Sequence, residues 1–184
     1  MDFFEAMEKR HSYRGKYKPE AVPREHLHKV MASGLAAPSG CNKQTTTLIG
    51  VDDETVMARI WVALGRLNEN WWEDPSAMST AKAAVVVLTQ KIIAHDDVSY
   101  YVEDYSAAIE NMLLAITALG YASCWIEGEI INAPEKQSVI AELLNVPQGY
   151  HVVAVLPVGV PEAQGRRPKF KAFEERASFN RFGG

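Results

Sequence analysis

The chain has 184 residues, 47% of them apolar and 23% charged, with a formal net charge of -4. This composition is typical of one globular domain that buries about 70% of the surface of its unfolded chain, so we predict a single domain over residues 1–184, with 161–184 as an extended C-terminal tail. The acidic balance argues against nucleic acid as the main partner, and the absence of a long apolar run or a signal-peptide core argues against a membrane partner, so we expect a cytoplasmic protein.

The first third of the chain predicts short helices and one strand. Asp2, with Glu5 three residues later, forms a capping-box-like helix start. The predicted elements are a helix from Asp2 to near Lys9, a helix from Pro23 to Pro38, a strand over 46–51, and a helix from Asp52 or Asp53 through Leu64.

The segment 37–44, Ala-Pro-Ser-Gly-Cys-Asn-Lys-Gln, is dense in turn-forming and amide side chains, as functional loops often are. Cys41 would need a neighbouring base to act as a nucleophile, and the sequence indicates none. Cys41 and Cys124 fit a reducing compartment better than a disulfide framework.

Two adjacent tryptophans, Trp71 and Trp72, lie in an irregular stretch. We favour a role in covering the core over a stacking surface for a flat ligand.

Residues 83–89, AAVVVLT, predict an interior strand buried on both faces. The next segment contains His95 and two aspartates, but a solvated loop is favoured over a metal site, so no metal is predicted.

The run 104–128 is the stretch around which the rest is organised. Residues 107–119 are almost all apolar, which predicts a helix enclosed nearly all round. Asp104 is expected to cap its start, and Gly120 to supply the left-handed residue at its end. Residues 121–126 then predict a short buried strand that ends at Glu127-Gly128.

The last third adds a helix opened by Pro134 and a second interior strand over 151–160. That helix is expected to point Val139 and Ile140, with Leu143 and Leu144, inward. Helices that alternate with a few strands predict an α+β or mixed α/β domain rich in helix. The central helix is larger than one protomer can cover, so we expect a homodimer with this helix near the interface.

Nine of the nineteen Lys and Arg side chains lie in two runs, 9–18 and 166–171. These are either solvated basic faces or groups that converge on one anion, such as a phosphate. No Gly-x-Gly-x-x-Gly follows a strand, and neither a Walker loop nor a Gly-x-Ser-x-Gly elbow is present. A resident dinucleotide domain, a P-loop and a serine hydrolase are therefore not supported.

Three segments together resemble the nitroreductase family of flavoproteins. They are Arg10-His11-Ser12-Tyr13-Arg14, the loop 37–44, and the run from Ala108 through Gly120 to Cys124-Trp125-Ile126-Glu127-Gly128. Their order and spacing, with the closing basic segment, cover nearly the whole chain.

The resemblance implies an α+β nitroreductase-like fold, with a central mixed sheet flanked by helices, in an intertwined homodimer that binds FMN at two sites built from both subunits. Arg14 would lie near the flavin pyrimidine edge, where a cation favours the negative charge of the reduced ring. A backbone N–H at Glu127-Gly128 would point at flavin N5. The phosphate and ribityl end would be held by Arg10, Ser12, Lys169 and Lys171, beside His11. The other cofactor-binding positions are Pro38, Ser39, Gly40, Asn42 and Gln44 from the partner's loop, and Trp125 and Ile126.

The implied activity is that of an oxidoreductase that takes hydride from a transiently bound NAD(P)H to a nitroaromatic, quinone or related acceptor without a catalytic side chain. The alternatives are a flavin storage or regulatory protein with little turnover, and a specialised relative such as a reductive dehalogenase or a flavin-destroying enzyme. The family's usual pyrimidine-side Asn and Lys are not matched, because Asn68 and Asn70 are only approximate candidates and residues 67–81 contain no lysine. Substrate stacking is assigned to Trp71, Trp72, Tyr100 and Tyr101.

Overall fold

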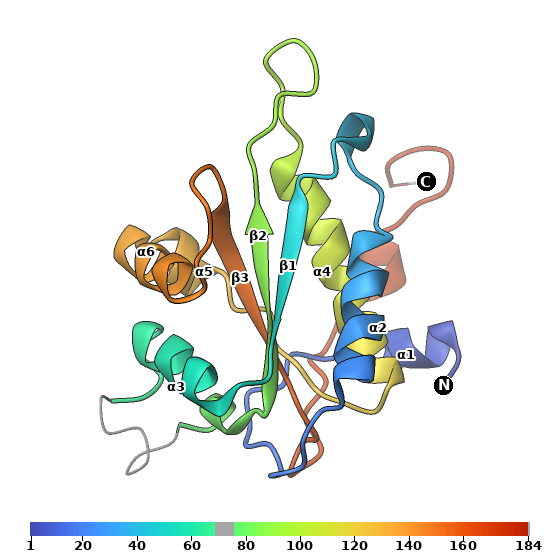
Figure 1. Ribbon diagram of the computed structural model, residues 1–184. Coiled ribbons are helices and arrows are strands. Elements are labelled where there is room, and N and C mark those ends of the chain that lie inside the picture. Colours follow the sequence, from blue (N-terminus) through green and yellow to red (C-terminus); the bar gives the residue numbers. More distant parts are fainter. Residues whose placement is uncertain (69–75, 184) are drawn as a thin grey trace.

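A three-stranded sheet forms the centre of the computed structural model, which describes residues 1–68 and 76–183 (Figure 1). The strands are β1 (Thr46–Val51), β2 (Ala83–Thr89) and β3 (His151–Val158), in the spatial order β1-β2-β3. Both pairings are antiparallel. Among the described residues, parallel pairing is limited to an isolated bridge between Ser12 and Ser123, outside the three strands, so the sheet is antiparallel and not mixed as expected.

Strand β2 is buried along its whole length, as its continuous apolar sequence predicts. Its two edges pair with β1 and β3, and helices cover both of its faces. Because alternate residues of a strand point to opposite faces, Val86 packs into one core, whereas Val85 and Val87 pack into the other. Strand β3 is buried in the same way but ends at Val158, two residues earlier than predicted.

Helices flank the sheet on both sides (Figure 1). On one side lie α1 (Phe3–Lys9), α2 (Arg24–Leu35) and α4 (Tyr101–Ala118), and on the other lie α3 (Glu54–Ala63), α5 (Gly128–Ile131) and α6 (Pro134–Leu143). Short 3-10 helices occur at η1 (Gly40–Asn42), η2 (Met78–Thr80) and η3 (Phe173–Glu175). Within the described ranges, no helix combines the length and the apolar content that crossing a bilayer requires.

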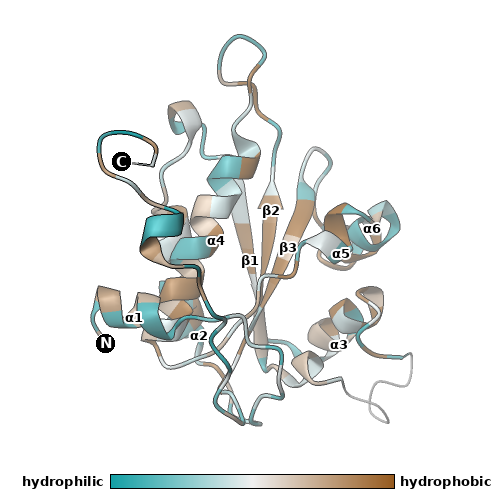
Figure 2. Ribbon diagram, turned by 180° about the vertical axis from the view of Figure 1, so that it is seen from behind, coloured by the Kyte–Doolittle hydropathy of each residue, from teal (hydrophilic) through white to brown (hydrophobic). Residues whose placement is uncertain are grey.

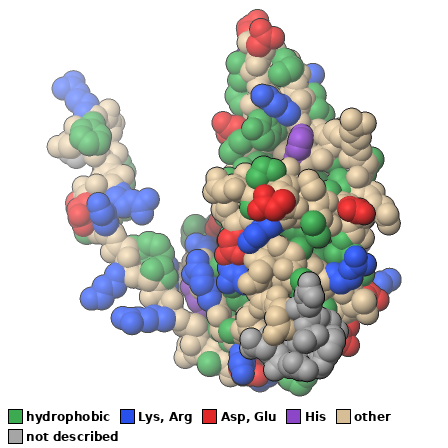
Figure 3. All heavy atoms as spheres, turned by 90° about the vertical axis from the view of Figure 1, so that its left-hand side faces the viewer, with side chains coloured by type: hydrophobic (Ala, Val, Ile, Leu, Met, Phe, Trp, Pro, Cys, Tyr) green, Lys and Arg blue, Asp and Glu red, His purple; other side chains and the backbone are tan. Residues whose placement is uncertain are grey.

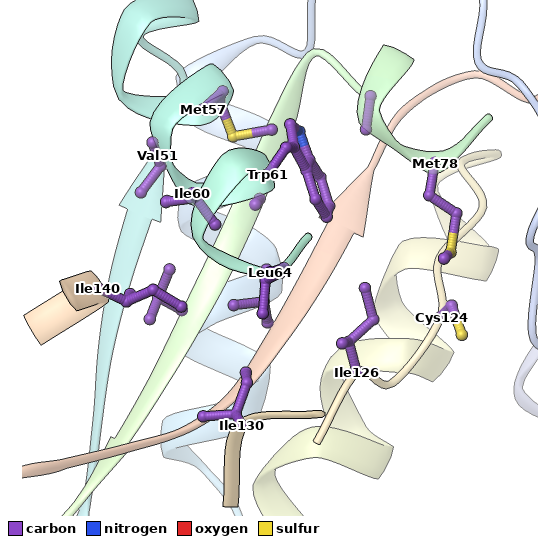
Figure 4. Close-up of a cluster of buried hydrophobic side chains, with 14 of the residues drawn as sticks. Val51, Met57, Ile60, Trp61, Leu64, Met78, Cys124, Ile126, Ile130 and Ile140 are labelled. Carbon is purple, nitrogen blue, oxygen red and sulfur yellow. The ribbon is translucent and has the colours of Figure 1, made fainter. Parts of the chain in front are cut away.

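Two hydrophobic cores hold these layers together, and apolar residues concentrate on the strands that separate them (Figure 2). The core under α3, α5 and α6 is built around Trp61, which is 1% exposed. Leu64, which caps the end of α3, Ile130 of α5 and Ile140 of α6 point into the same cluster (Figure 4). The second core joins α2 and α4 to the sheet through Val30, Ile109, Met112 and Ile116.

Local signals in the sequence set several element ends as predicted. The Asp2 carboxylate accepts the Glu5 N–H at 2.9 Å at the start of α1, and Asp53 accepts the Val56 N–H at 2.9 Å at the start of α3. Gly120 follows α4 with a φ of 85°, the left-handed conformation in which glycine meets no steric penalty.

Three expectations around α4 and α6 are wrong. Helix α4 begins at Tyr101, so Asp104 lies inside its first turn and does not cap it. Residues 121–126 make isolated bridges rather than a regular strand, because Ala122 pairs with Gly159 whereas Ile126 pairs with Val155. In α6 the side chain of Val139 is exposed, since the helix turns only one narrow face, around Ile140, toward the core.

The apolar face predicted for the first helix exists, but one protomer leaves it uncovered. Phe3 and Phe4 of α1 are 60% and 75% exposed. Helix α4 is enclosed on one face only, with Ala118 exposed and Leu114 half-buried on the other. Large exposed side chains also occur in the tail, at Phe170, Phe173, Phe179 and Phe182.

Candidate functional site

Two segments that the sequence singles out lie side by side. The Tyr13 N–H donates to the Ser123 carbonyl at 2.8 Å, and Ser12 and Ser123 form the parallel bridge. This pairing brings the run 10–14 next to Ser123, four residues before Glu127. A cationic stretch is therefore joined by backbone hydrogen bonds to the segment that leads into α5.

The two arginines of the first run have different surroundings. Arg10 is half-buried, and its Nε lies 3.1 Å from Oε1 of Glu110 on α4. Arg14 is exposed. Burial raises the pKa of the Cys124 thiol, and the positive charges of Arg14 and Arg66 oppose this rise. Arg14 thus contributes positive potential beside the second segment.

His11 marks the place where the tail meets the first run. Its Nδ1 lies 2.9 Å from the Lys9 carbonyl oxygen, and its ring packs so closely on Gly165 that any side chain there would collide with it. The Glu162 N–H donates to the Lys16 carbonyl at 3.0 Å. The first basic run therefore lies beside the start of the tail, up to Gly165.

Beyond Gly165 the tail stands off from the body of the protomer, and it carries several of the basic side chains (Figure 3). Lys169 and Lys171 are exposed, and no described ion pair or hydrogen bond joins either to the first basic run. The Arg167 guanidinium lies 5.1 Å from the centre of the Phe170 ring. One protomer thus does not bring the two predicted phosphate-binding groups together.

The segment 125–128 is fixed from two directions. Ile126 exchanges backbone hydrogen bonds with Val155 of β3, at 3.2 and 2.9 Å. The carboxylate of Glu127 accepts the Tyr105 hydroxyl at 2.6 Å. Burial and the neighbouring Glu127 raise the pKa of Tyr105, which keeps this hydroxyl protonated as a donor. Gly128 is exposed and begins α5.

Polar atoms near these segments lack partners. The Ser123 hydroxyl and the Trp125 indole N–H are buried, and neither has a hydrogen-bond partner among the described residues. Buried polar groups of this kind normally have a partner, and those at a binding site often obtain it from a ligand. These two atoms lie next to the cationic run 10–14, so a polar ligand bound here would meet both positive charge and hydrogen-bonding groups without a partner in the described chain.

The loop 38–44 lies at the start of α4. Gly40 donates its N–H to Asp104 at 2.7 Å, and the Gln44 N–H donates to the Ser39 hydroxyl at 3.0 Å. Pro38 and Asn42 are exposed, as is Gln44, and nothing in the described chain joins this loop to 10–14. One protomer thus presents the loop on its surface, apart from the paired segments.

The nitroreductase family model matches residues 7–160, which contain the paired segments and the loop. The chain belongs to the nitroreductase family. A protein of Archaeoglobus fulgidus named NADH dehydrogenase/NAD(P)H nitroreductase is 28% identical over 148 residues, 79% of this chain and 78% of that protein. A Bacteroides fragilis nitroreductase structure with bound FMN is 26% identical, covers 94% of each chain, and has a TM-score of 0.70. An iodotyrosine deiodinase of Haliscomenobacter hydrossis is 23% identical over 96% of this chain and 86% of that protein.

Of the four side chains assigned to substrate stacking in this nitroreductase-family chain, the structure describes the two tyrosines. Trp71 and Trp72, with Asn70, lie outside the described residues. Tyr100 is half-buried, its ring packs against Gly40, and its hydroxyl lies 3.4 Å from His95 Nε2. Tyr101 is half-buried beside Tyr105, with ring centres 6.4 Å apart. In the part of the chain that the structure describes, no three His, Cys, Asp or Glu side chains are grouped to hold a metal ion.

The sequence did not indicate the partners that fix the site. Asp104 and Tyr105 are polar residues that are buried on α4 among apolar ones, and Glu110 lies on the same helix. A polar side chain on the buried face of a helix needs a hydrogen-bond partner, so the sequence could have indicated that these residues have partners. It does not tell which partner.

Proposed function

We propose that this chain is an FMN-dependent oxidoreductase that takes electrons from NADH or NADPH and passes them to a nitroaromatic, quinone or related acceptor. The observation that carries the proposal is the backbone pairing of Ser12 and Tyr13 with Ser123, which puts a cationic run beside unpartnered polar atoms. The FMN in the Bacteroides fragilis structure and the names of the relatives support the same cofactor and reductant.

Different residues of this chain would bind different parts of FMN. Arg10 and Ser12 would bind the phosphate and ribityl end, with Lys169 and Lys171 of the tail, and His11 would lie beside them. Arg14 would place positive charge near the pyrimidine edge. Pro38, Ser39, Gly40, Asn42 and Gln44 would pack on the ring from the partner subunit. When bound, FMN supplies hydride chemistry at N5.

The segment 125–128 would orient the reactive part of the ring. A backbone N–H at Glu127-Gly128 would face N5, and Trp125 would line the approach, whereas Ile126, whose side chain is buried in the core, would hold the segment in place. The hydrogen bond from Tyr105 fixes the Glu127 side chain, and the pairing with β3 fixes the chain just before it. The protein thus supplies position and electrostatic environment, and no side-chain nucleophile is needed.

We infer a homodimer from the surfaces that one protomer leaves uncovered. Phe3 and Phe4 of α1 and the four tail phenylalanines are exposed, and the tail stands off from the body (Figure 3). Burying apolar surface of this extent is a main driving force for association. Truncation after Gly165 should therefore give monomers that retain no FMN, measured by light scattering and flavin absorbance; a dimer that keeps FMN would contradict the inference.

The test of the function is the visible spectrum of the protein with FMN, before and after anaerobic addition of NADH or NADPH. We expect flavin bands that bleach with the nucleotide and return on addition of a nitroaromatic or quinone, with iodotyrosine as a further acceptor to compare. Bound flavin that neither nucleotide reduces would favour the alternative, a storage or regulatory flavin protein. No FMN binding at all would refute the proposal.

Arg10→Ala tests the phosphate assignment. A hydrogen bond to a charged group contributes about 1.5–3 kcal/mol, so FMN should bind about 10- to 150-fold more weakly. The control is Arg24→Ala, which removes another arginine paired with a carboxylate, Asp52, but away from the paired segments. Fluorescence titration measures both dissociation constants. FMN affinity that is unchanged from wild type in both Arg10→Ala and Lys169→Ala would remove both residues from the site.

A further inference from the structure

Asp104 is a buried carboxylate that the proposed reaction does not use. Its side chain lies in the first turn of α4 and the residue is 4% exposed. Oδ1 accepts the Gly40 N–H at 2.7 Å, and Oδ2 accepts the Thr45 hydroxyl at 2.7 Å. Gly40 belongs to the loop 38–44 and Thr45 follows it directly, so neither partner lies on the helix that carries the aspartate.

We propose that Asp104 is a positioning residue that holds the loop 38–44 in the conformation that binds FMN in the partner's site. The proposal rests on the proposed function, because it assigns this loop to the flavin ring. It concerns the affinity and orientation of the flavin, and Asp104 itself does not touch the reacting atoms.

The loop has a backbone that needs external support. Cys41, Asn42 and Gln44 have φ angles of 50°, 54° and 49°. Non-glycine residues adopt this left-handed region at a cost, and such residues persist only where surrounding contacts hold them. All three are exposed, so packing inside the protomer does not supply that support.

The contacts of Asp104 provide the support at both ends of this strained stretch. Gly40 lies before it and Thr45 after it, so one carboxylate spans the loop. The Thr45 carbonyl in turn accepts the Gln90 N–H at 3.0 Å and the Thr89 hydroxyl at 3.3 Å, which ties the loop to the end of β2. The Tyr100 ring fills the space beside Gly40, where any side chain would collide with it.

A carboxylate suits this place better than other side chains. The Gly40 N–H can only donate, and the Thr45 hydroxyl donates here as well, so a side chain with two oxygen acceptors meets both groups. The first turn of the 18-residue helix α4 also favours negative charge, because its free N–H groups point that way. An asparagine would keep the shape but present an NH₂ group to one of the two donors.

The test compares Asp104→Asn and Thr45→Val with Asp53→Asn. Asp53 also accepts a backbone N–H, from Val56 at 2.9 Å, but does so at the start of α3, so its variant controls for the same Asp→Asn change at a helix start away from the loop. FMN dissociation constants come from fluorescence titration, and melting temperatures of the FMN-free proteins come from circular dichroism.

We expect FMN affinity to fall at least fivefold in Asp104→Asn and Thr45→Val, and to stay within twofold of wild type in Asp53→Asn. The double variant should bind FMN about as tightly as the single variant with the lower affinity, because both substitutions act through one network. Lower melting temperatures with unchanged FMN affinity in both loop variants would overturn the proposal. Wild-type protein that binds no FMN would instead refute the proposed function.

Mixed dimers add a readout that a merely structural role would not produce. When Asp104→Asn and Arg10→Ala chains are co-expressed with different tags, one site combines the intact Arg10 of the first chain with the intact loop of the second. We expect tight FMN binding at one site in each mixed dimer and at neither site of the parent variants. Mixed dimers without a tight site would overturn the assignment of this loop to the partner's flavin.

Discussion

The hydrogen bond between Tyr105 and Glu127 is the contact whose loss is easiest to predict. Tyr105→Phe removes a hydroxyl that donates to a carboxylate at 2.6 Å and leaves the ring in place. Such a bond contributes about 1.5–3 kcal/mol, and the half-buried Glu127 regains some hydration, so we expect the lower end of this range. For a chain of 184 residues this lowers the melting temperature by about 3–6 °C.

The pH dependence of the stability difference between wild type and Tyr105→Phe tests whether the Tyr105 hydroxyl causes it. Because the pKa of Tyr105 is raised above its ordinary value of 10.0, the folded state keeps a proton that the unfolded state releases. The stabilisation is therefore complete below pH 10.0 and is lost as the pH rises further toward the pKa of the folded state. Tyr17 has a pKa raised by burial in both proteins, so its effect cancels in the comparison.

The assay is thermal unfolding of the FMN-free wild type, Tyr105→Phe and Tyr101→Phe at several pH values. Tyr101 lies one turn earlier on α4 and controls for loss of a hydroxyl from this helix. Its variant should change the free energy of unfolding by less than about 0.5 kcal/mol. A Tyr105→Phe melting temperature equal to that of wild type, or a difference that persists unchanged far above pH 10, would refute the reasoning.

Three further changes test other parts of the molecule. Cys41→Ser should leave turnover and FMN retention close to wild type in steady-state assays, because no thiol chemistry is involved; abolished turnover with FMN still bound would contradict this. Gly34→Ala should cost about 1–3 kcal/mol in urea unfolding, since its new Cβ would lie 2.7 Å from Met112 Cγ, and unchanged stability would show that α2 and α4 can separate without strain. Arg24 lowers the pKa of Asp52 through a hydrogen bond, so Arg24→Ala should be slightly less stable than wild type above pH 3.8. In stronger acid, where Asp52 is protonated, the two proteins should be equally stable. A stability difference that persists in strong acid would contradict the pairing.

The sequence predicts those features that depend on near neighbours. Asp2 and Asp53 cap their helices as expected, since each bonds an N–H three residues away. Gly120 ends α4 in the left-handed conformation that its position indicates. The strand Ala83–Thr89 is found with its predicted ends, because an unbroken apolar run fits only the centre of a sheet.

The contacts that build the site could not be predicted because they join distant parts of the chain. Asp104 is interpreted as a helix cap because aspartate favours that position, yet its partner Gly40 lies 64 residues earlier. Tyr105 and Glu127 are separated by 22 residues, and no local pattern connects them. Periodicity likewise predicts the apolar face around Phe3 and Phe4, but it does not tell whether the same protomer covers that face.

The position of β3 has a consequence for how the protein is made. Strand β2 ends at Thr89, but the partner for one of its edges begins only at His151. While a ribosome synthesises the chain from the N-terminus, that edge and the faces of both cores stay open until most residues have emerged. Sheets assembled from such distant segments fold slowly, and exposed strand edges promote aggregation. We therefore expect the nascent chain to depend on chaperones until translation is nearly complete, and cofactor loading to follow release from the ribosome.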